Sequence, residues 1–125
     1  MDNADALARF RRDGSPEAFR ALVDRHAPMV YAACRRGLGG DAAQAEDAAQ
    51  AVFVVLARKA ASIRDASALG PWLFRAAGFV VRTMRRETER RRRREAVAAA
   101  AARREQEGAM RPAEQAAWRR ALPPL

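Results

Sequence analysis

The sequence predicts an all-α protein, and three observations support this prediction. Alanine and arginine, which favour helix, are frequent, whereas a single tyrosine, seven glycines and six prolines argue against a sandwich or barrel. Apolar residues recur at helical spacing. The length of 125 residues, half of them apolar, allows one domain with a modest core. We therefore expect a compact bundle of three to four helices, with a long, arginine-rich third main helix projecting from the core.

Start and stop signals define the first two helices. Residues 2–12 form a short helix that ends at Asp13-Gly14. Ser15 is the expected N-cap of the next helix, with Pro16 at the first helical position, and this helix reaches about residue 36. Its apolar stripe follows the three-and-four spacing of an amphipathic helix and comprises Phe19, Leu22, Val23, His26, Val30, Ala33 and Cys34.

A glycine-rich break at residues 37–40 precedes a helix that Asp41 caps and that extends to about Ala61. Acidic residues near its start (Glu46, Asp47) and basic residues at its end suit the helix dipole. Its inward stripe comprises Ala45, Ala49, Val52, Phe53, Leu56 and Ala60.

Residues 62–70 form a polar loop, and Pro71 begins the third long helix. The expected core face of this helix comprises Trp72, Leu73, Ala76, Phe79, Val80 and Met84. From Arg85 the chain is strongly charged and lacks an apolar stripe, so the helix should leave the core, fray and end near Gly108. Pro112 begins a last short helix. The expected division is a short N-terminal helix at 1–14, a helical domain at 15–95, and an Ala/Arg-rich helical linker and tail at 96–125.

The net charge of +9 is unevenly distributed along the chain. Residues 1–69 contain 10 basic and 9 acidic groups, whereas residues 70–125 contain 14 basic and 6 acidic groups. Nearly all the basic residues are arginine, whose planar guanidinium suits phosphate contacts. A genome rich in G and C would also enrich arginine and alanine, but it would not explain the asymmetry. The distribution favours a polyanionic partner.

Several classes of protein are excluded. No apolar run approaches the ~20 residues that cross a bilayer, and the acidic N-terminus lacks the features of a signal peptide, so we expect a cytoplasmic protein without membrane contact. One cysteine, Cys34, cannot form an internal disulfide, and no metal or cofactor site is expected. His26 and Cys34 are interpreted as core residues. The sequence has no phosphate loop and no nucleophile–base arrangement, so we do not expect an enzyme.

Three segments resemble region 2 of the extracytoplasmic-function (ECF) group of the sigma-70 family of RNA polymerase sigma factors: FRALVDRHAPMVYAACRRGLG, DAAQAEDAAQAVFVVLARKA and LGPWLFRAAGFVVRTMRRE. The resemblance spans about residues 15–95 and depends on the order AEDxxQxVFxxL, a nine-residue loop and PWLFRxA. It implies a bacterial sigma factor that directs transcription initiation. We do not expect the family's region 4 within these 125 residues, which are interpreted as ending in the linker, either as a fragment of a longer protein or as a natural truncation.

The resemblance implies two partners, core RNA polymerase and promoter DNA, and it allows an anti-sigma factor as a third. The second helix of the resemblance docks on the clamp helices of the largest polymerase subunit. Carried over to this sequence, the polymerase-binding residues are Glu46, Asp47, Gln50, Phe53 and Leu56. Ala51 departs from the family, in which a glutamate commonly follows the glutamine, and one polar contact is therefore missing.

The loop and third helix of the resemblance recognise and open the promoter −10 element. Trp72 matches the tryptophan of the family's WL pair, whereas Gly78-Phe79 replaces the family's frequent Arg-Asn. At 100° per residue, four arginines lie on one side of the third long helix: Arg75, Arg82, Arg86 and Arg93. The expected DNA-binding residues are Arg64, Trp72, Arg75, Arg82, Arg85 and Arg86.

A further hypothesis is that the polar loop and the following tryptophan form a pocket that holds one unstacked base of the DNA. The residues of this expected pocket are Ser62, Arg64, Asp65, Ser67 and Trp72. Alternatives stay open here: Trp72 as a core anchor, Glu46 and Asp47 as dipole partners, and the arginines at 90–94 as a solvated tail. A general basic nucleic-acid-binding helical protein without polymerase contact is the main alternative function, and a basic helix at a membrane or an acidic partner is another. The acidic, apolar helix at 41–61 discriminates between these functions, because a sigma factor needs this helix exposed to bind polymerase, whereas the other two have no use for it.

Overall fold

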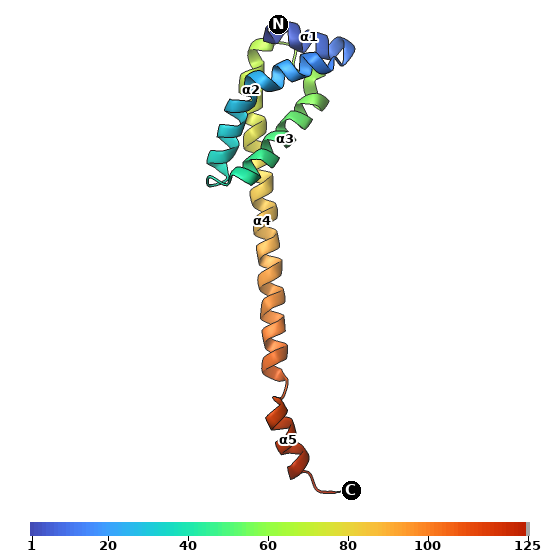
Figure 1. Cartoon of the computed structure of the whole chain (residues 1–125), viewed down its shortest axis with the longest axis vertical. Helices are drawn as coiled ribbons and strands as arrows, with labels where there is room; N and C mark the ends of the chain where they lie inside the picture. The colour runs from blue at the N-terminus through green and yellow to red at the C-terminus, as the bar shows by residue number, and fades with distance from the viewer. Residues whose placement is uncertain (125) are drawn as a thin grey trace. The chain divides into compact units, whose positions relative to one another are not determined.

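The computed structural model describes residues 1–124, and this part of the chain contains helices and no strand. Figure 1 shows the α-helices α1 to α5 in chain order. Two short 3-10 helices, η1 and η2, lie between α3 and α4. Their bounds are α1 (Asn3–Asp13), α2 (Pro16–Gly37), α3 (Ala42–Lys59), η1 (Ala60–Ser62), η2 (Ala66–Ala68), α4 (Leu69–Gly108) and α5 (Pro112–Ala121). The prediction of an all-α fold is confirmed.

The chain divides into two compact units, which we call the N-terminal unit (Met1–Arg86) and the C-terminal unit (Glu87–Leu125). The N-terminal unit is a bundle of α1, α2, α3 and the first part of α4. In the C-terminal unit, the described side chains are exposed almost throughout. All residues with a predicted binding role lie in the N-terminal unit.

Side-chain caps begin the helices at the positions that the sequence predicts. The Ser15 hydroxyl accepts a hydrogen bond from the Ala18 N–H at 3.2 Å, and the Asp41 carboxylate accepts one from the Gln44 N–H at 3.1 Å. Gly14 ends α1 with a φ of 65°, in the left-handed region that suits glycine. The predicted start of the last helix at Pro112 and the predicted end of α4 at Gly108 are also confirmed.

The boundaries around the polar loop differ from the prediction. The helix expected to reach Ala61 ends at Lys59 and continues as a 3-10 turn, and α4 begins at Leu69, two residues before Pro71. Leu69 is fully buried, so the core holds this residue in the first helical turn. Pro71 is tolerated in that turn because the first N–H groups of a helix have no intrahelical partner to lose.

One hydrophobic core holds the N-terminal unit together. α1 belongs to it, since Ala6 and Leu7 are buried and the rings of Phe10 and Phe19 lie 4.9 Å apart. The helices and the segment between η1 and η2, which supplies Ile63, contribute the buried residues Ala6, Leu7, Ala18, Leu22, Val30, Cys34, Ala45, Ala48, Val52, Phe53, Leu56, Ala60, Ile63, Leu69, Leu73, Ala77, Val80 and Val81. Within the described residues, this cluster contains no buried charged side chain.

The predicted core face of α4 is wrong at one residue, Phe79. Phe79 is 63% exposed, whereas Leu73 and Val80 are buried and Trp72, Ala76 and Met84 are half-buried against the core. The buried stripe of α4 runs through Leu69, Leu73, Ala77, Val80 and Val81. A residue two positions after the buried Ala77 is rotated by about 200° and therefore faces away from the core.

His26 and Cys34 are core-associated, as predicted. The His26 Nε2 lies 3.2 Å from the Asn3 Oδ1, in a contact that links α2 to α1, and burial followed by the nearby Arg25 charge lowers the pKa of the imidazole. Cys34 is fully buried, and burial raises the pKa of its thiol. Neither side chain has the exposed, activating surroundings of a reactive group.

Gly37 allows the end of α2 to approach α4 closely. A Cβ at this position would lie 2.7 Å from the Val81 Cγ1, and the branched valine is buried and stiff at χ1.

We expect Gly37→Ala to lower the free energy of unfolding by about 1–3 kcal/mol through overpacking. Thermal unfolding followed by circular dichroism measures this. The combined variant with Val81→Ala should lose less than the sum of the two single variants. A higher melting temperature for Gly37→Ala, as helix propensity alone predicts, would contradict the proposed clash.

Candidate docking groove and basic helix face

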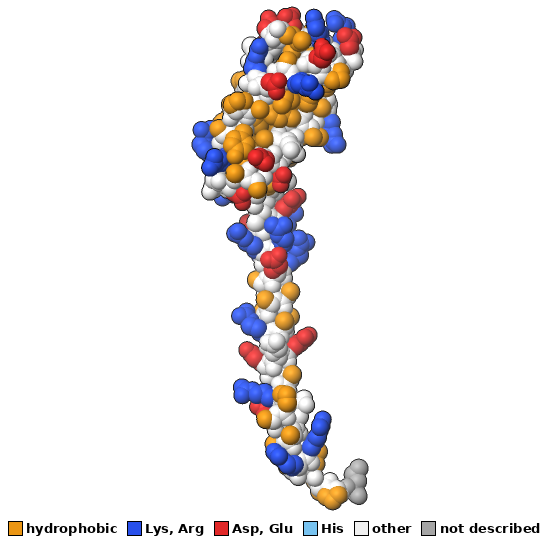
Figure 2. Space-filling view, in the orientation of Figure 1, with side chains coloured by type: hydrophobic (Ala, Val, Ile, Leu, Met, Phe, Trp, Pro, Cys, Tyr) orange, Lys and Arg blue, Asp and Glu red, His pale blue; other side chains and the backbone are white. Residues whose placement is uncertain are grey.

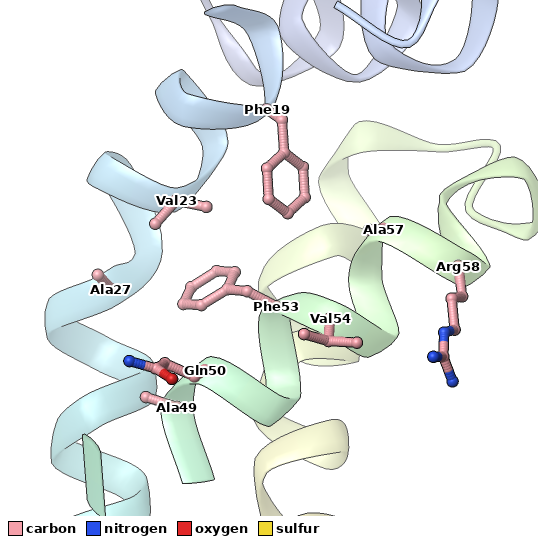
Figure 3. Close-up of a pocket in the computed structure, with 9 residues that line it drawn as sticks. All are labelled: Phe19, Val23, Ala27, Ala49, Gln50, Phe53, Val54, Ala57 and Arg58. Atoms are coloured by element: carbon pink, nitrogen blue, oxygen red, sulfur yellow. The ribbon is translucent and has the colours of Figure 1, made fainter. Parts of the chain in front are cut away.

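A groove with an apolar lining runs between α2 and α3, with a volume of about 580 Å³. Figure 3 shows Phe19 of α2 and Phe53 of α3 with their rings directed into the space between the two helices, while Arg58 points away. The lining comprises Phe19, Val23, Ala27, Ala49, Gln50, Phe53, Val54, Ala57 and Arg58. The groove therefore presents apolar surface that the N-terminal unit does not cover itself.

A second hollow continues this groove along the same two helices. Both are lined by Ala27, Ala49 and Gln50, and the second adds two carboxylates, Asp24 and Glu46. Figure 2 shows hydrophobic side chains gathered on the face formed by α2 and α3, with acidic side chains beside them. We call the two hollows together the α2–α3 groove. Its surface is mainly apolar along its length, with two carboxylates at one end.

The predicted polymerase-binding residues do not all lie at this groove. Glu46 and Gln50 line it and are exposed. Asp47 is exposed on a neighbouring face of α3, and Phe53 lines the groove although only 8% of the residue is exposed. The prediction of a polymerase contact for Leu56 is wrong for this structure, because Leu56 is fully buried in the core.

The position of Leu56 follows from helix geometry. At 100° per residue, Leu56 lies within about 40° of both Ala45 and Val52, near the centre of the buried stripe of α3, whereas Phe53 lies at its edge. An edge position allows one side chain to contact the core and still line a groove.

Glu46 and Asp47 lie beyond the reach of the helix dipole. The first turn of α3 contains no acidic residue, and Asp41 supplies the cap. Since the dipole effect falls off within the first turn, it gives little reason for carboxylates at these positions. Their exposure on the outer side of α3 instead makes them available to a partner.

An arginine face lies on the part of α4 that belongs to the N-terminal unit. Arg75, Arg82 and Arg86 are exposed and, at 100° per residue, lie within about 40° of one another around the helix. Arg85 is exposed about 80° from Arg75. We call Arg75, Arg82 and Arg86 the arginine face. Arg93, predicted to share this side, belongs to the C-terminal unit and forms an ion pair with Glu89 at 2.9 Å.

A smaller hollow lies beside Trp72, between the last turns of α3 and the first turns of α4. Its volume is about 290 Å³, and it is lined by Val55, Lys59, Trp72, Arg75, Ala76, Phe79 and Val80. We call it the Trp72 hollow. Phe79 and Lys59 are the members that sequence analysis missed. A helical projection with Ala77 as the centre of the core face would have placed Phe79 beside the arginines.

The expected base receptor combines four loop residues with Trp72, but these loop residues do not line the hollow beside Trp72. The Ser62 hydroxyl donates to the Lys59 carbonyl at 2.6 Å, and the Ser67 hydroxyl donates to the Asp65 carboxylate at 2.8 Å. The side-chain and backbone hydrogen bonds from Ser67 lower the pKa of Asp65. Arg64 is exposed. None of these four residues lines the Trp72 hollow, and the Arg64 carbonyl instead accepts a hydrogen bond from the Arg11 guanidinium of α1 at 3.4 Å.

The fold and these surfaces define a class of protein, a small helical module with an apolar docking groove and a separate cationic helix face. The family model for Sigma-70 region 2 matches residues 22–96, which is more than half of the chain. The chain therefore belongs to the sigma-70 region 2 family, whose members act in RNA polymerase binding and promoter melting. Comparison with curated proteins and with solved structures found no match.

No helix in residues 1–124 is both long and apolar enough to span a bilayer. Over the same residues, no group of three or more His, Cys, Asp or Glu side chains could hold a metal ion.

Proposed function

We propose that this chain is region 2 of a bacterial sigma factor of the ECF group, which binds core RNA polymerase through the α2–α3 groove and the promoter −10 element through α4. The observation that supports this best is the separation of two unlike surfaces on one bundle. The α2–α3 groove is apolar and partly acidic, whereas α4 carries the arginine face. A protein that joins polymerase to DNA needs both.

The α2–α3 groove suits a helical partner such as the clamp helices. Helices dock in apolar grooves through a few large side chains, and polar residues at the rim fix orientation. Phe19 and Phe53 supply apolar surface, while Glu46 and Gln50 supply the polar rim. Asp47 extends this acidic surface around α3. Because Ala51 lacks the carboxylate common in the family, the apolar part of the groove contributes a larger share of the contact.

The arginine face suits the phosphate backbone of promoter DNA. Guanidinium groups on one side of a straight helix can follow one strand, and such contacts position the duplex without specifying its sequence. Arg64 in the loop, Trp72 at the start of α4 and Arg85 complete the proposed DNA surface. The proposed site of action is the cytoplasm, where polymerase and promoter meet.

A charge placed in the groove tests the polymerase contact. Val54 is 50% exposed and lines the groove, so Val54→Asp should leave the fold intact. We expect it to weaken binding to core polymerase at least about tenfold, because a carboxylate desolvated without a partner costs more than the ~1.4 kcal/mol that this factor represents. Titration of labelled core polymerase with the full chain measures the change.

Val97→Asp is the matched control, since Val97 is 68% exposed and lies in the C-terminal unit. Equal binding by the two variants would contradict the groove as the polymerase site. Failure of the wild-type chain to bind core polymerase, with DNA binding retained, would instead support a general nucleic-acid-binding protein. The charge asymmetry of the sequence is the observation that keeps this second function in consideration.

A further inference from the structure

The short helix α5 presents an exposed apolar side. Trp118 is 57% exposed, and Leu122, at the C-cap, is 61% exposed. At 100° per residue the two lie about 40° apart around the helix, and Ala121 extends the same side. None of the ten residues of α5 is buried. Because an isolated helix of this length is marginal in water and gains stability mainly by packing an apolar side, α5 has the properties of a docking helix.

The charges of α5 are arranged unevenly around this apolar side. Arg119 lies about 100° from Trp118, at the flank, whereas Arg120 lies about 160° from Trp118, on the far side of the helix. The acidic residue of α5, Glu114, is engaged at the helix start. Its carboxylate accepts a hydrogen bond from the Arg111 N–H at 3.4 Å and lies 4.0 Å from the Arg111 Nε. A partner that covers the apolar side of α5 therefore meets one arginine beside it.

The α2–α3 groove has the complementary properties. Its first hollow has a volume of about 580 Å³ and a mostly apolar lining, and Figure 3 shows two phenylalanine rings directed into it. An indole ring is a large apolar group that pairs well with other aromatic rings, so Trp118 suits this hollow. The adjoining hollow contains the carboxylates of Asp24 and Glu46, which suit the guanidinium of Arg119.

We propose that α5 of one copy of this chain docks in the α2–α3 groove of a second copy, with Trp118 in the apolar hollow and Arg119 beside Asp24 and Glu46. Reciprocal exchange of the two helices closes a two-fold dimer in which both grooves are filled. Two docked helices of ten residues give an interface near the lower end of the ~1,200–2,000 Å² range of stable complexes, so we expect a dissociation constant of micromolar order.

The dimer has a consequence for the proposed function, although it does not depend on that function. The groove that receives α5 is the proposed polymerase site, and one groove cannot hold both partners. Self-association would therefore withhold the chain from polymerase at high concentration, and core polymerase would dissociate the dimer. Trp118→Ala, which lacks the competing side chain, should bind core polymerase at least as tightly as the wild type.

Sedimentation equilibrium of the full chain measures the dimer directly. We expect the mean mass to rise from that of one chain toward that of two between about 1 µM and about 1 mM protein. Trp118→Ala should weaken the dimer at least about tenfold, as the loss of a central aromatic anchor does, and Trp118→Phe should weaken it less. Since Trp118 is exposed, both variants should keep the melting temperature of the wild type, which circular dichroism verifies.

Arg119→Glu and Arg120→Glu form a matched pair, because each lowers the net charge by two, from +9 to +7. We expect Arg119→Glu to weaken the dimer at least about tenfold through repulsion by the groove carboxylates. Arg120→Glu, on the far side of α5, should change the dissociation constant less than about twofold. Exchange of the two charges, in Arg119→Glu combined with Glu46→Arg, should restore the dimer to within about threefold of the wild type.

Three results would overturn the proposal: a mean mass of one chain at every concentration, a dimer that Trp118→Ala leaves intact, or equal weakening by the two arginine variants. These measurements contain no polymerase, so they are separable from the test with Val54→Asp. A chain that dimerises but does not bind polymerase would lose the sigma factor assignment and keep the dimer. A chain that binds polymerase but stays monomeric would keep its proposed function and lose the dimer.

Discussion

Leu56→Ala is expected to lower the free energy of unfolding of the N-terminal unit by about 2–5 kcal/mol, the cost of a cavity at a fully buried leucine. A domain of this size has about 5–15 kcal/mol in total, so the melting temperature should fall by many degrees. Urea denaturation followed by circular dichroism measures the change. Polymerase affinity per folded molecule should remain near that of the wild type, because Leu56 offers no surface to a partner.

Two further variants make this expectation specific. Leu56→Met keeps the side-chain volume and should cost less than about 1.5 kcal/mol. Val54→Asp, two residues away but half-exposed, should show the opposite pattern, with stability nearly unchanged and polymerase binding weakened. If Leu56→Ala were as stable as the wild type and specifically defective in polymerase binding, the burial of Leu56 in the working protein would be contradicted.

Local signals made most helix boundaries predictable. Ser15 and Asp41 act through hydrogen bonds to N–H groups three residues away, and Gly14 through its own backbone angle, so nothing distant is needed to place these ends. The start of α4 was not predictable in this way. Leu69 is helical because it packs into the core, and that contact depends on chain segments far away in the sequence.

The candidate site shows a different limit. Residue type identifies which side chains are apolar, but it does not fix the direction that each one takes around its helix. Leu56 was predicted both to lie on the inward stripe of its helix and to contact polymerase, although one side chain cannot be buried in the core and also contact a partner. Phe79 was assigned to the core face with the other apolar residues of its helix, whereas the buried stripe of α4 passes through Ala77 and leaves Phe79 outside. Small buried alanines carry a weak hydrophobic signal, and this obscures the true centre of a stripe.

The arginine face, in contrast, was predictable from the positions of the arginines in the sequence, and its three residues can be tested together. We expect replacement of Arg75, Arg82 and Arg86 by glutamine to make the slope of log affinity against log salt for duplex DNA less steep by about 2.7, at about 0.9 for each lost phosphate contact. The same relation gives a loss of about 500-fold in affinity at 0.1 M salt. Fluorescence anisotropy with a duplex across a range of salt concentrations measures both quantities.

Net charge alone would predict the same loss for any three arginines, and a control on α2 removes this ambiguity. Replacement of Arg20, Arg35 and Arg36 by glutamine lowers the net charge from +9 to +6, as the α4 variant does. All three are exposed, and α2 meets α4 at Val81, about 120° around that helix from Arg75. Since a phosphate contact requires a guanidinium at the DNA surface, the α2 variant should keep a slope close to that of the wild type. Equal slopes for the two variants would mean that the basic chain binds DNA through its overall charge and that the arginine face has no special role.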